Sequence, residues 1–88
     1  MKDFIQLHEK DNVVVALKNL EEAAMIAVNG KPIQLKSAIG FGHKIAIQPI
    51  RAGEKILKYG LPIGSATKDI AAGEHVHVQN LKTDYSPK

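Results

Sequence analysis

The chain is a series of short apolar runs separated by polar or glycine-containing steps. The first two runs, residues 4–7 and 13–17, are separated by a polar segment that ends in Asp11-Asn12, a pair that favours turns. Short apolar runs bounded by turn residues are typical of strands. We therefore expect two strands here, with His8 exposed at the end of the first.

An Asn29-Gly30 pair lies between the apolar residues 26–28 and the segment 32–35. This pair is the strongest short signal for a β-hairpin, because a type I′ turn requires positive φ at both central residues. A two-residue loop sets Ile26 opposite Ile33 on one buried face. The preceding residues have helical propensity when taken alone, but the strand-like run that follows at once favours the hairpin.

Residues 43–48 are expected to form a strand whose buried face carries Ile45 and Ile47. His43 is in phase with these isoleucines but lies at the start of the strand. A loose glycine-containing step precedes it, and we expect one helical turn before that step, from Ser37. Residues 58–64 contain two glycines and a proline, so we expect them to form a loop.

The chain also repeats a turn. Residues 49–56 align with residues 69–76, and both segments contain Ile-x-Ala-Gly-Glu, then one residue, then a β-branched residue. Residues 19–26 resemble a degenerate third copy, which has alanine at the glycine and glutamate positions. Each copy predicts an apolar anchor, a tight turn in which glycine supplies a positive φ, and a new strand. Glu54 and Glu74 hold equivalent turn positions, so we expect structural or solvated roles for both.

The next stretch carries the most informative side chains, because Val76 and Val78 alternate with His75, His77 and Gln79. Successive side chains of a strand point to opposite faces. The valines are therefore expected to face a core, with both histidines and the glutamine on the other face. Two histidines at this spacing suit two ligands of one metal ion or two contacts to one anion. The alternative is a polar face in contact with solvent.

Two histidines alone do not make a catalytic metal site, which usually needs three protein ligands. A third ligand would come from His43 or from a partner chain, although a histidine on an apolar phase is more often a buried, hydrogen-bonded residue. Lys44 points to the opposite side of its strand. Together with Lys58 and Tyr59 it could bind a carboxylate, and each of the three can equally be a surface residue.

The composition narrows the functional classes. The chain has 88 residues, which allows one small domain, and it has no cysteine, which removes disulfides and thiolate chemistry. No serine lies in a Gly-x-Ser-x-Gly elbow, and no signal peptide or membrane span is evident. The net charge is +3, but the lysines are scattered and aromatic residues make up only 5% of the chain, so nucleic-acid binding is not expected. A reducing cytoplasm suits this composition.

Several of these segments, in this order and spacing, resemble the SAF domain of the altronate and galactarate dehydratase family, to which sulfolactate dehydratases are related. The resemblance covers nearly the whole chain, from about residue 12 to residue 83. The segments that carry it are Gly42-His43-Lys44-Ile45-Ala46, Lys58-Tyr59-Gly60-Leu61-Pro62-Ile63-Gly64, Asp69-Ile70 and Gly73-Glu74-His75-Val76-His77-Val78.

The resemblance implies a mainly β domain with the β-clip fold, built from short antiparallel strands and tight turns with at most one or two short helical turns. We expect it to span residues 1–82, with residues 83–88 as a C-terminal tail. The implied reaction is dehydration of a sugar acid to a 2-keto-3-deoxy acid with the help of a divalent metal, Fe²⁺ or Mn²⁺. Family members often carry a third histidine at the position of Gln79, so a ligand there would be weaker in this chain.

The dehydratases also have a large second domain that this sequence lacks, so the resemblance implies a large catalytic subunit or domain as partner. That partner is expected to hold the catalytic base and most of the metal ligands, so that the histidines of this chain complete or cover the site. A homo-oligomer remains open. Catalytic candidates in this chain are His43, His75 and His77, with Lys44, Lys58, Tyr59 and Gln79 as substrate contacts. Met1 and the short tail favour a separately encoded small subunit over an excised domain. The alternative function is a stand-alone SAF domain that binds a sugar acid or carbohydrate without catalysis, as SAF-like domains also occur in sialic acid synthases and resemble type III antifreeze proteins.

Overall fold

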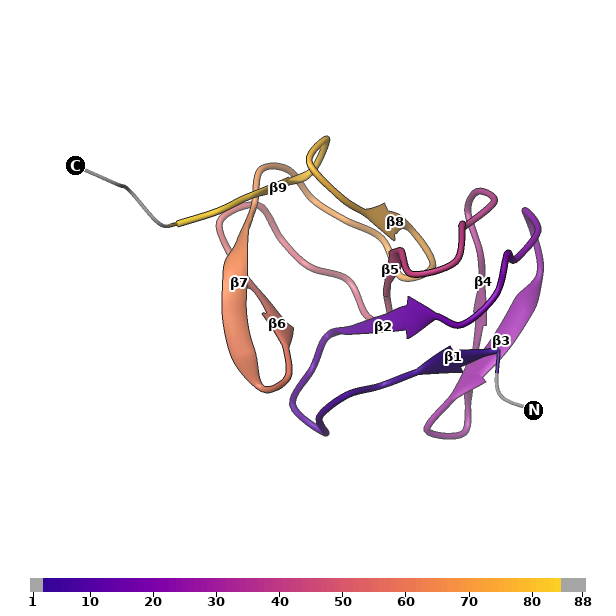
Figure 1. The fold of residues 1–88 in the computed structure, drawn as a ribbon. Helices are drawn as coiled ribbons and strands as arrows, with labels where there is room; N and C mark the ends of the chain where they lie inside the picture. Colours follow the sequence, from indigo (N-terminus) through magenta and orange to yellow (C-terminus); the bar gives the residue numbers. More distant parts are fainter. Residues whose placement is uncertain (1–2, 85–88) are drawn as a thin grey trace.

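The protein is described by a computed structural model, which covers residues 3–84. This part of the chain contains short strands and no helix, so the prediction of a mainly β fold is confirmed (Figure 1). The strands are β1 (Phe4–Ile5), β2 (Val13–Ala16), β3 (Met25–Val28), β4 (Lys31–Gln34), β5 (Lys44–Ala46), β6 (Lys55–Lys58), β7 (Leu61–Ala66), β8 (His75–Val76) and β9 (Leu81–Lys82).

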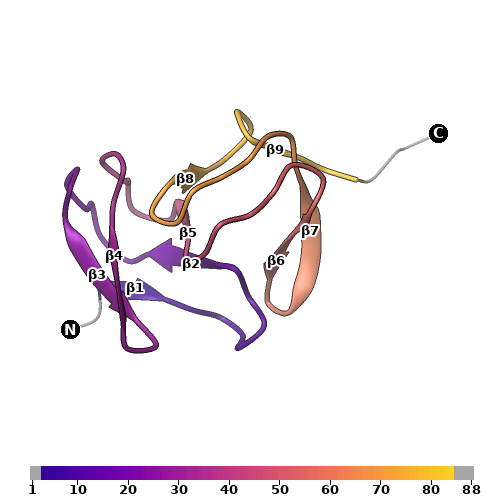
Figure 2. The same ribbon diagram turned by 180° about the vertical axis from the view of Figure 1, so that it is seen from behind.

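The strands form three small antiparallel sheets. A central sheet has the order β1-β2-β5-β8, the hairpin β3–β4 forms a second sheet, and β6-β7-β9 form a third. The two hairpins, β3–β4 and β6–β7, lie on opposite sides of the central sheet in both ribbon views (Figures 1 and 2). The central sheet is therefore covered on both sides, and each side encloses its own apolar core.

Alternate side chains of the central strands fill these two cores. Val14 and Ile45 belong to a first cluster with the residues of β3 and β4, whereas Val13, Ala46 and Val76 belong to a second cluster with residues of β6 and β7. All five are at most 1% exposed. Full burial of such a side chain contributes about 1.5–3 kcal/mol. Two small cores that share one sheet thus replace the single larger core of a bigger domain.

The predicted Asn29-Gly30 hairpin is confirmed. Ile26 lies opposite Ile33 in the β3–β4 ladder. Asn29 and Gly30 have φ values of 52° and 81°, as a type I′ turn requires.

The prediction of a loop over residues 58–64 is wrong, because β6 and β7 form a second hairpin there. Its turn residues, Tyr59 and Gly60, both have positive φ. The carboxylate of Asp11 accepts hydrogen bonds from the backbone N–H groups of Tyr59, at 3.0 Å, and Gly60, at 2.7 Å. This distant acceptor stabilises a turn for which the local sequence gives only a weak signal.

The repeated Ile-x-Ala-Gly-Glu turn is confirmed in both copies. Gly53 and Gly73 have φ values of 88° and 89°. In each copy the glutamate folds back onto its own turn: Glu54 Oε1 accepts a hydrogen bond from Arg51 N at 2.6 Å, and Glu74 Oε1 accepts one from Ala71 N at 2.9 Å. The two glutamates therefore have the structural role that the sequence predicted.

The same turn occurs twice more in the first half of the chain. Ala23 occupies the glycine position of the degenerate copy, residues 19–26, with a φ of 68°. Gly42 occupies the same position in a further copy that the sequence pattern did not indicate, with a φ of 83°. The helical turn expected from Ser37 is absent, because Ile39 instead forms an isolated β-bridge with Leu20.

The two halves of the chain have matching hydrogen bonds. Ile50 pairs with Ile70 just as Leu20 pairs with Ile39. Likewise Gly42 N donates to Ala16 O, and Gly73 N donates to Ala46 O, both at 2.8 Å. The chain therefore builds two similar half-domains around the shared central sheet.

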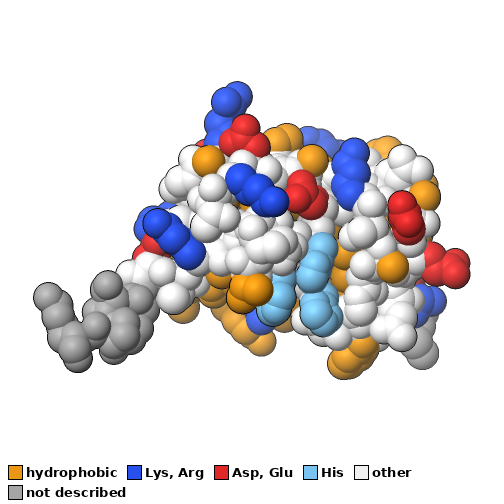
Figure 3. Space-filling view, turned by 90° about the horizontal axis from the view of Figure 1, so that it is seen from above, with side chains coloured by type: hydrophobic (Ala, Val, Ile, Leu, Met, Phe, Trp, Pro, Cys, Tyr) orange, Lys and Arg blue, Asp and Glu red, His pale blue; other side chains and the backbone are white. Residues whose placement is uncertain are grey.

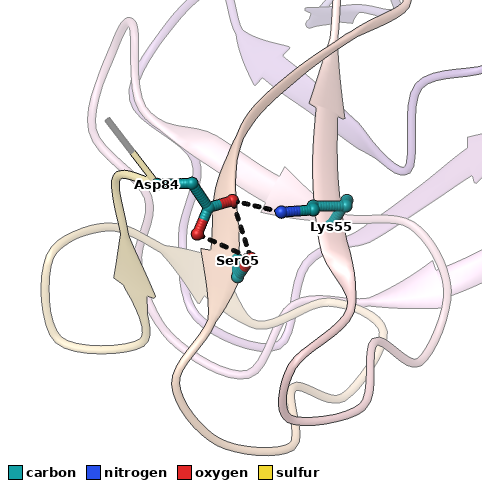
Figure 4. Close-up of polar contacts among 3 residues, drawn as sticks. All are labelled: Lys55, Ser65 and Asp84. Carbon is teal, nitrogen blue, oxygen red and sulfur yellow. Dashed lines mark hydrogen bonds and ion pairs between the residues drawn. The ribbon is translucent and has the colours of Figure 1, made fainter. Parts of the chain in front are cut away.

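Residues 83 and 84 fall in the predicted tail, yet Asp84 contacts the third sheet (Figure 4). Its carboxylate lies 2.6 Å from Lys55 Nζ and accepts hydrogen bonds from Ser65 Oγ at 2.8 and 2.9 Å. The hydrogen bonds from Lys55 and Ser65 lower the pKa of Asp84. Residues 85–88 of that tail lie outside the described residues. Within residues 3–84, no helix is long and apolar enough to cross a membrane.

Candidate functional site

The structure brings His43, His75 and His77 together in one cluster. The ring centroids of His43 and His75 are 5.0 Å apart, and the ring of His77 lies 5.7 Å from each of them. His43 Nδ1 and His75 Nε2 are 2.9 Å apart, so one nitrogen donates a hydrogen bond and the other accepts it. Figure 3 shows histidine side chains gathered on one face of the molecule, with hydrophobic side chains beside them.

The strand register explains why His43 and His75 meet. His75 in β8 lies directly opposite Ile45 in β5, and directly opposed residues share a face of the sheet. His43 precedes Ile45 by two residues and therefore points toward the same face. The turn at Gly42 delivers His43 to the start of β5, where its ring reaches across to β8.

The sequence prediction for the end of this stretch is wrong. Strand β8 ends at Val76, so the alternation of faces does not continue, and Val78 is 76% exposed instead of buried. Gln79 lies in the turn after the strand, where its Nε2 donates to His75 O at 3.1 Å. The glutamine thus contacts the backbone of the cluster and does not extend a face of the strand. His77 reaches the cluster from the bend after β8.

Sequence reasoning missed Asn80, which ends the strand at this point. The side chain is fully buried, and it bonds the backbone of both His75 and His77. The available signal was an asparagine just after a predicted strand, because asparagine side chains often bond nearby backbone groups in turns. The alternating pattern of the preceding residues outweighed that signal.

The surroundings of His75 favour its neutral form. Partial burial lowers the pKa of His75, and the neighbouring His43, His77 and Lys44 lower it further. A neutral imidazole retains a lone pair, so it can accept a proton or bind a cation. His75 can therefore offer a nitrogen lone pair to the cluster.

The proposed carboxylate contacts do not all lie with the histidines. Lys44 lies opposite Val15 and Val76, and so on the other face of β5 from His43. Burial and the nearby Lys58 lower the pKa of Lys44. Neither ammonium is paired with a carboxylate in the part of the chain that the structure describes.

Tyr59 lies in the turn of the second hairpin and is 63% exposed. Lys58 Nζ is 5.8 Å from the centroid of its ring. The structure therefore places Lys44, Lys58 and Tyr59 in a second polar region, apart from the face that carries His43, whereas Gln79 lies with the histidines.

The histidines alone do not form a complete metal site. Among residues 3–84, no group of three or more His, Cys, Asp or Glu side chains is arranged to hold a metal ion. Two nitrogens of His43 and His75 do converge within 2.9 Å, and imidazole suits several divalent transition metals. The donors therefore fit a metal only as part of a larger ligand set.

One open groove, of about 470 Å³, lies elsewhere on the molecule. It is lined by residues 3–6 around β1 and residues 27–29 at the end of β3, and none of these is a histidine. The groove carries none of the predicted site residues, so we assign the candidate site to the histidine cluster.

Comparison with known proteins places this geometry in a family. The chain is 46% identical over 86 residues to altronate dehydratase of Bacillus subtilis (strain 168) and 45% identical over 83 residues to altronate dehydratase of Escherichia coli (strain K12). These alignments cover 98% and 94% of this chain but only 17% of each relative, so the chain spans about a sixth of their length.

A shorter relative is covered almost completely. The (2R)-sulfolactate sulfo-lyase subunit alpha of Chromohalobacter salexigens is 35% identical over 89 residues, which covers 92% of this chain and 94% of the relative. The family model for the altronate/galactarate dehydratase SAF domain matches residues 2–84, and the chain therefore belongs to that family.

Proposed function

We propose that the chain is the SAF component of a sugar-acid hydro-lyase, which dehydrates an acid such as altronate to a 2-keto-3-deoxy acid together with a large catalytic subunit or domain. The observation that carries this proposal is the convergence of three histidines in a chain that belongs to a dehydratase SAF family. The proposed setting is the cytoplasm.

Dehydration of a sugar acid requires two proton movements. A base removes the proton next to the carboxylate, and the neighbouring hydroxyl leaves as water after it gains a proton. A neutral imidazole can act as the base, and the imidazolium that it becomes can then protonate the leaving hydroxyl. His75, whose pKa is lowered, and His43, which shares a hydrogen bond with it, are the proposed proton-handling groups of this chain.

Alternatively, His75 and His77 would complete the ligand set of a divalent metal, Fe²⁺ or Mn²⁺, held mainly by the large partner, and His75 would then bind the ion in place of moving a proton. Such an ion supplies Lewis-acid stabilisation of the negative charge that develops on the substrate. Lys44, Lys58, Tyr59 and Gln79 are the proposed contacts for a carboxylate or hydroxyl group of the sugar acid. Two lysines without a carboxylate partner support that role.

The need for a large partner has two supports. The chain spans 17% of the altronate dehydratases, whereas it spans 94% of a relative that is itself a subunit. The histidine face also exposes Phe41 and Val78, which are 67% and 76% exposed and lie in the turns that carry His43 and His77. Exposed apolar side chains beside a functional cluster are typical of a surface that a partner covers. We expect the isolated chain to be inactive.

The test is co-expression of this chain with the large protein encoded beside it, under anaerobic conditions with iron(II) or manganese(II), followed by an assay of 2-keto acid formation from altronate, galactarate and sulfolactate. Product is expected only from the complex. His75→Ala and His77→Ala should abolish most of the activity. The control His8→Ala changes an exposed histidine that accepts a bond from Lys10 N and should leave activity intact. Failure of every combination to consume a hydroxy acid would contradict the proposal.

The second candidate function is sugar-acid binding without catalysis. The half-buried Lys44 beside Lys58 favours it, because two ammonium groups without a carboxylate partner attract an anion. This candidate predicts that the isolated chain binds altronate in calorimetric titration, and that Lys44→Met weakens the binding.

A further inference from the structure

Asn80 is buried and polar, and all of its hydrogen-bonding groups are used. Its Oδ1 accepts from His77 N at 3.0 Å, and its Nδ2 donates to His75 O at 2.8 Å. Its backbone N–H donates to His77 O at 3.0 Å, and its backbone oxygen accepts from Thr67 N at 2.9 Å. A buried group in which each polar atom has a partner fixes the geometry of its partners, because each lost bond leaves a buried polar atom unpaired.

The partners of the Asn80 side chain are the backbones of two cluster histidines. Strand β8 is an edge strand of the central sheet, so no further strand pairs with its open side. The side chain of Asn80 instead forms the hydrogen bonds to His75 and His77 that a neighbouring strand would form. It thereby ends β8 at Val76 and turns the chain so that both imidazoles lie on one side.

Asn12 forms the same pair of bonds at another strand. Its Oδ1 accepts from Leu57 N at 2.8 Å, and its Nδ2 donates to Lys55 O at 3.0 Å. Asn12 is also buried, at 8% exposure, but it bonds β6, which carries no histidine. The chain therefore contains a matched internal control for Asn80.

We propose that Asn80 is the positioning residue of the histidine cluster: its side-chain amide holds the backbone of His75 and His77 so that both rings stay in contact with His43. The inference goes beyond the proposed reaction and does not depend on it. It concerns the geometry of the cluster in the full chain, which can be measured without substrate, metal or partner.

The experiment compares Asn80→Ala with Asn12→Ala in the full chain labelled with ¹⁵N-histidine, at about pH 8, where imidazoles are neutral. Both variants should lower Tm, by roughly 5–15 °C, because each leaves buried backbone groups unpaired. Only Asn80→Ala should lose the ring-to-ring nuclear Overhauser effects (NOEs) between His43 and His75. It should also lose the single tautomer that their hydrogen bond imposes, which the imidazole ¹⁵N shifts report.

Two results would overturn the proposal: unchanged ring contacts in Asn80→Ala, or equal loss of those contacts in Asn12→Ala. If Asn80→Ala does not fold, Asn80→Asp replaces it, since it keeps the size of the side chain and the acceptor for His77 N–H. Its carboxylate cannot donate to His75 O at this pH, so we expect loss of the His43–His75 NOEs in a folded chain. Wild-type NOEs in that variant would also overturn the proposal. Neither result would affect the proposed dehydratase function.

Discussion

The turn that leads into β5 and the turn that leads into β8 have the same backbone and different chemistry. Gly42 and Gly73 have nearly equal φ values, 83° and 89°, and both donate to a carbonyl of the preceding central strand. The residue after the glycine differs: Glu74 bonds its own turn, whereas His43 contacts His75 on the neighbouring strand. The repeated turn thus stabilises itself in one half and supplies a side chain of the histidine cluster in the other.

The two turns also differ in their packing. A Cβ atom added at Gly73 would lie 2.1 Å from Gln34 O, whereas one added at Gly42 would meet nothing within 4 Å. The turn into β8 is therefore packed tightly against β4, and the turn into β5 is open to solvent. An open turn leaves room for a partner or ligand to approach His43.

The largest effect is expected for Gly73→Ala. The new methyl group clashes with the backbone of β4, and alanine is also strained at positive φ. We therefore expect the free energy of unfolding to fall by about 3 kcal/mol or more, the size seen for disruptive core substitutions. Gly42→Ala introduces only the strain of a positive φ, without a clash, and should lower the free energy of unfolding by about 1 kcal/mol. Urea denaturation of both variants measures the difference. Equal losses would show that the two turns are packed alike.

A smaller effect is expected for Glu74→Ala, which removes the acceptor for Ala71 N. Loss of this exposed, charge-assisted bond should cost about 1 kcal/mol in the free energy of unfolding. Glu54→Ala should cost a similar amount, since it caps the equivalent turn. Glu74→Gln keeps an oxygen acceptor and serves as the control. A loss as large for Gln as for Ala would argue against the capping role.

The stability of the domain should depend on pH through His75. Its folded-state pKa lies below that of the unfolded chain, so in acid the unfolded state binds more protons and is favoured. Stability is therefore complete above the unfolded pKa of about 6.5 and falls as the pH drops below it toward the lowered folded-state value. We expect Tm to fall gradually as the pH drops below about 6.5.

His75→Gln should flatten this profile, because the group with the lowered pKa is gone. His8→Gln is the matched control, since His8 is exposed and lies outside the cluster. Thermal denaturation at several pH values, followed by circular dichroism, compares the three chains. A profile that is as steep in His75→Gln as in the wild type would exclude His75 as the source.

The smallest effect is expected at Ala23, which takes a glycine position of the repeated turn at φ 68°. Ala23→Gly relieves the strain of a left-handed alanine, at the cost of greater freedom in the unfolded chain. We expect the free energy of unfolding to rise by a few tenths of a kcal/mol, up to about 1 kcal/mol. Denaturant melts measure it. A net loss would show that Ala23 is not strained in the way that its φ indicates.

Local patterns in the sequence predicted the parts of the fold that adjacent residues control. Asn29-Gly30 specifies its hairpin because both residues tolerate positive φ, and the Ile-x-Ala-Gly-Glu repeat specifies a turn that its own glutamate caps. These interactions join residues at most a few positions apart. The sequence also identified the histidine-bearing stretch, although it extended the strand too far.

Tertiary structure decided the features that depend on distant partners. Asp11 and Asn12 bond the second hairpin across more than forty residues of chain, which makes a hairpin of a segment that we predicted as a loop. His43 meets His75 only because β5 pairs with β8. Alternating polar and apolar residues predict which side chains share a face only as far as the strand continues. Beyond Val76, where β8 ends, the buried amide of Asn80 bonds the backbone of His75 and His77, and only the fold brings these groups together.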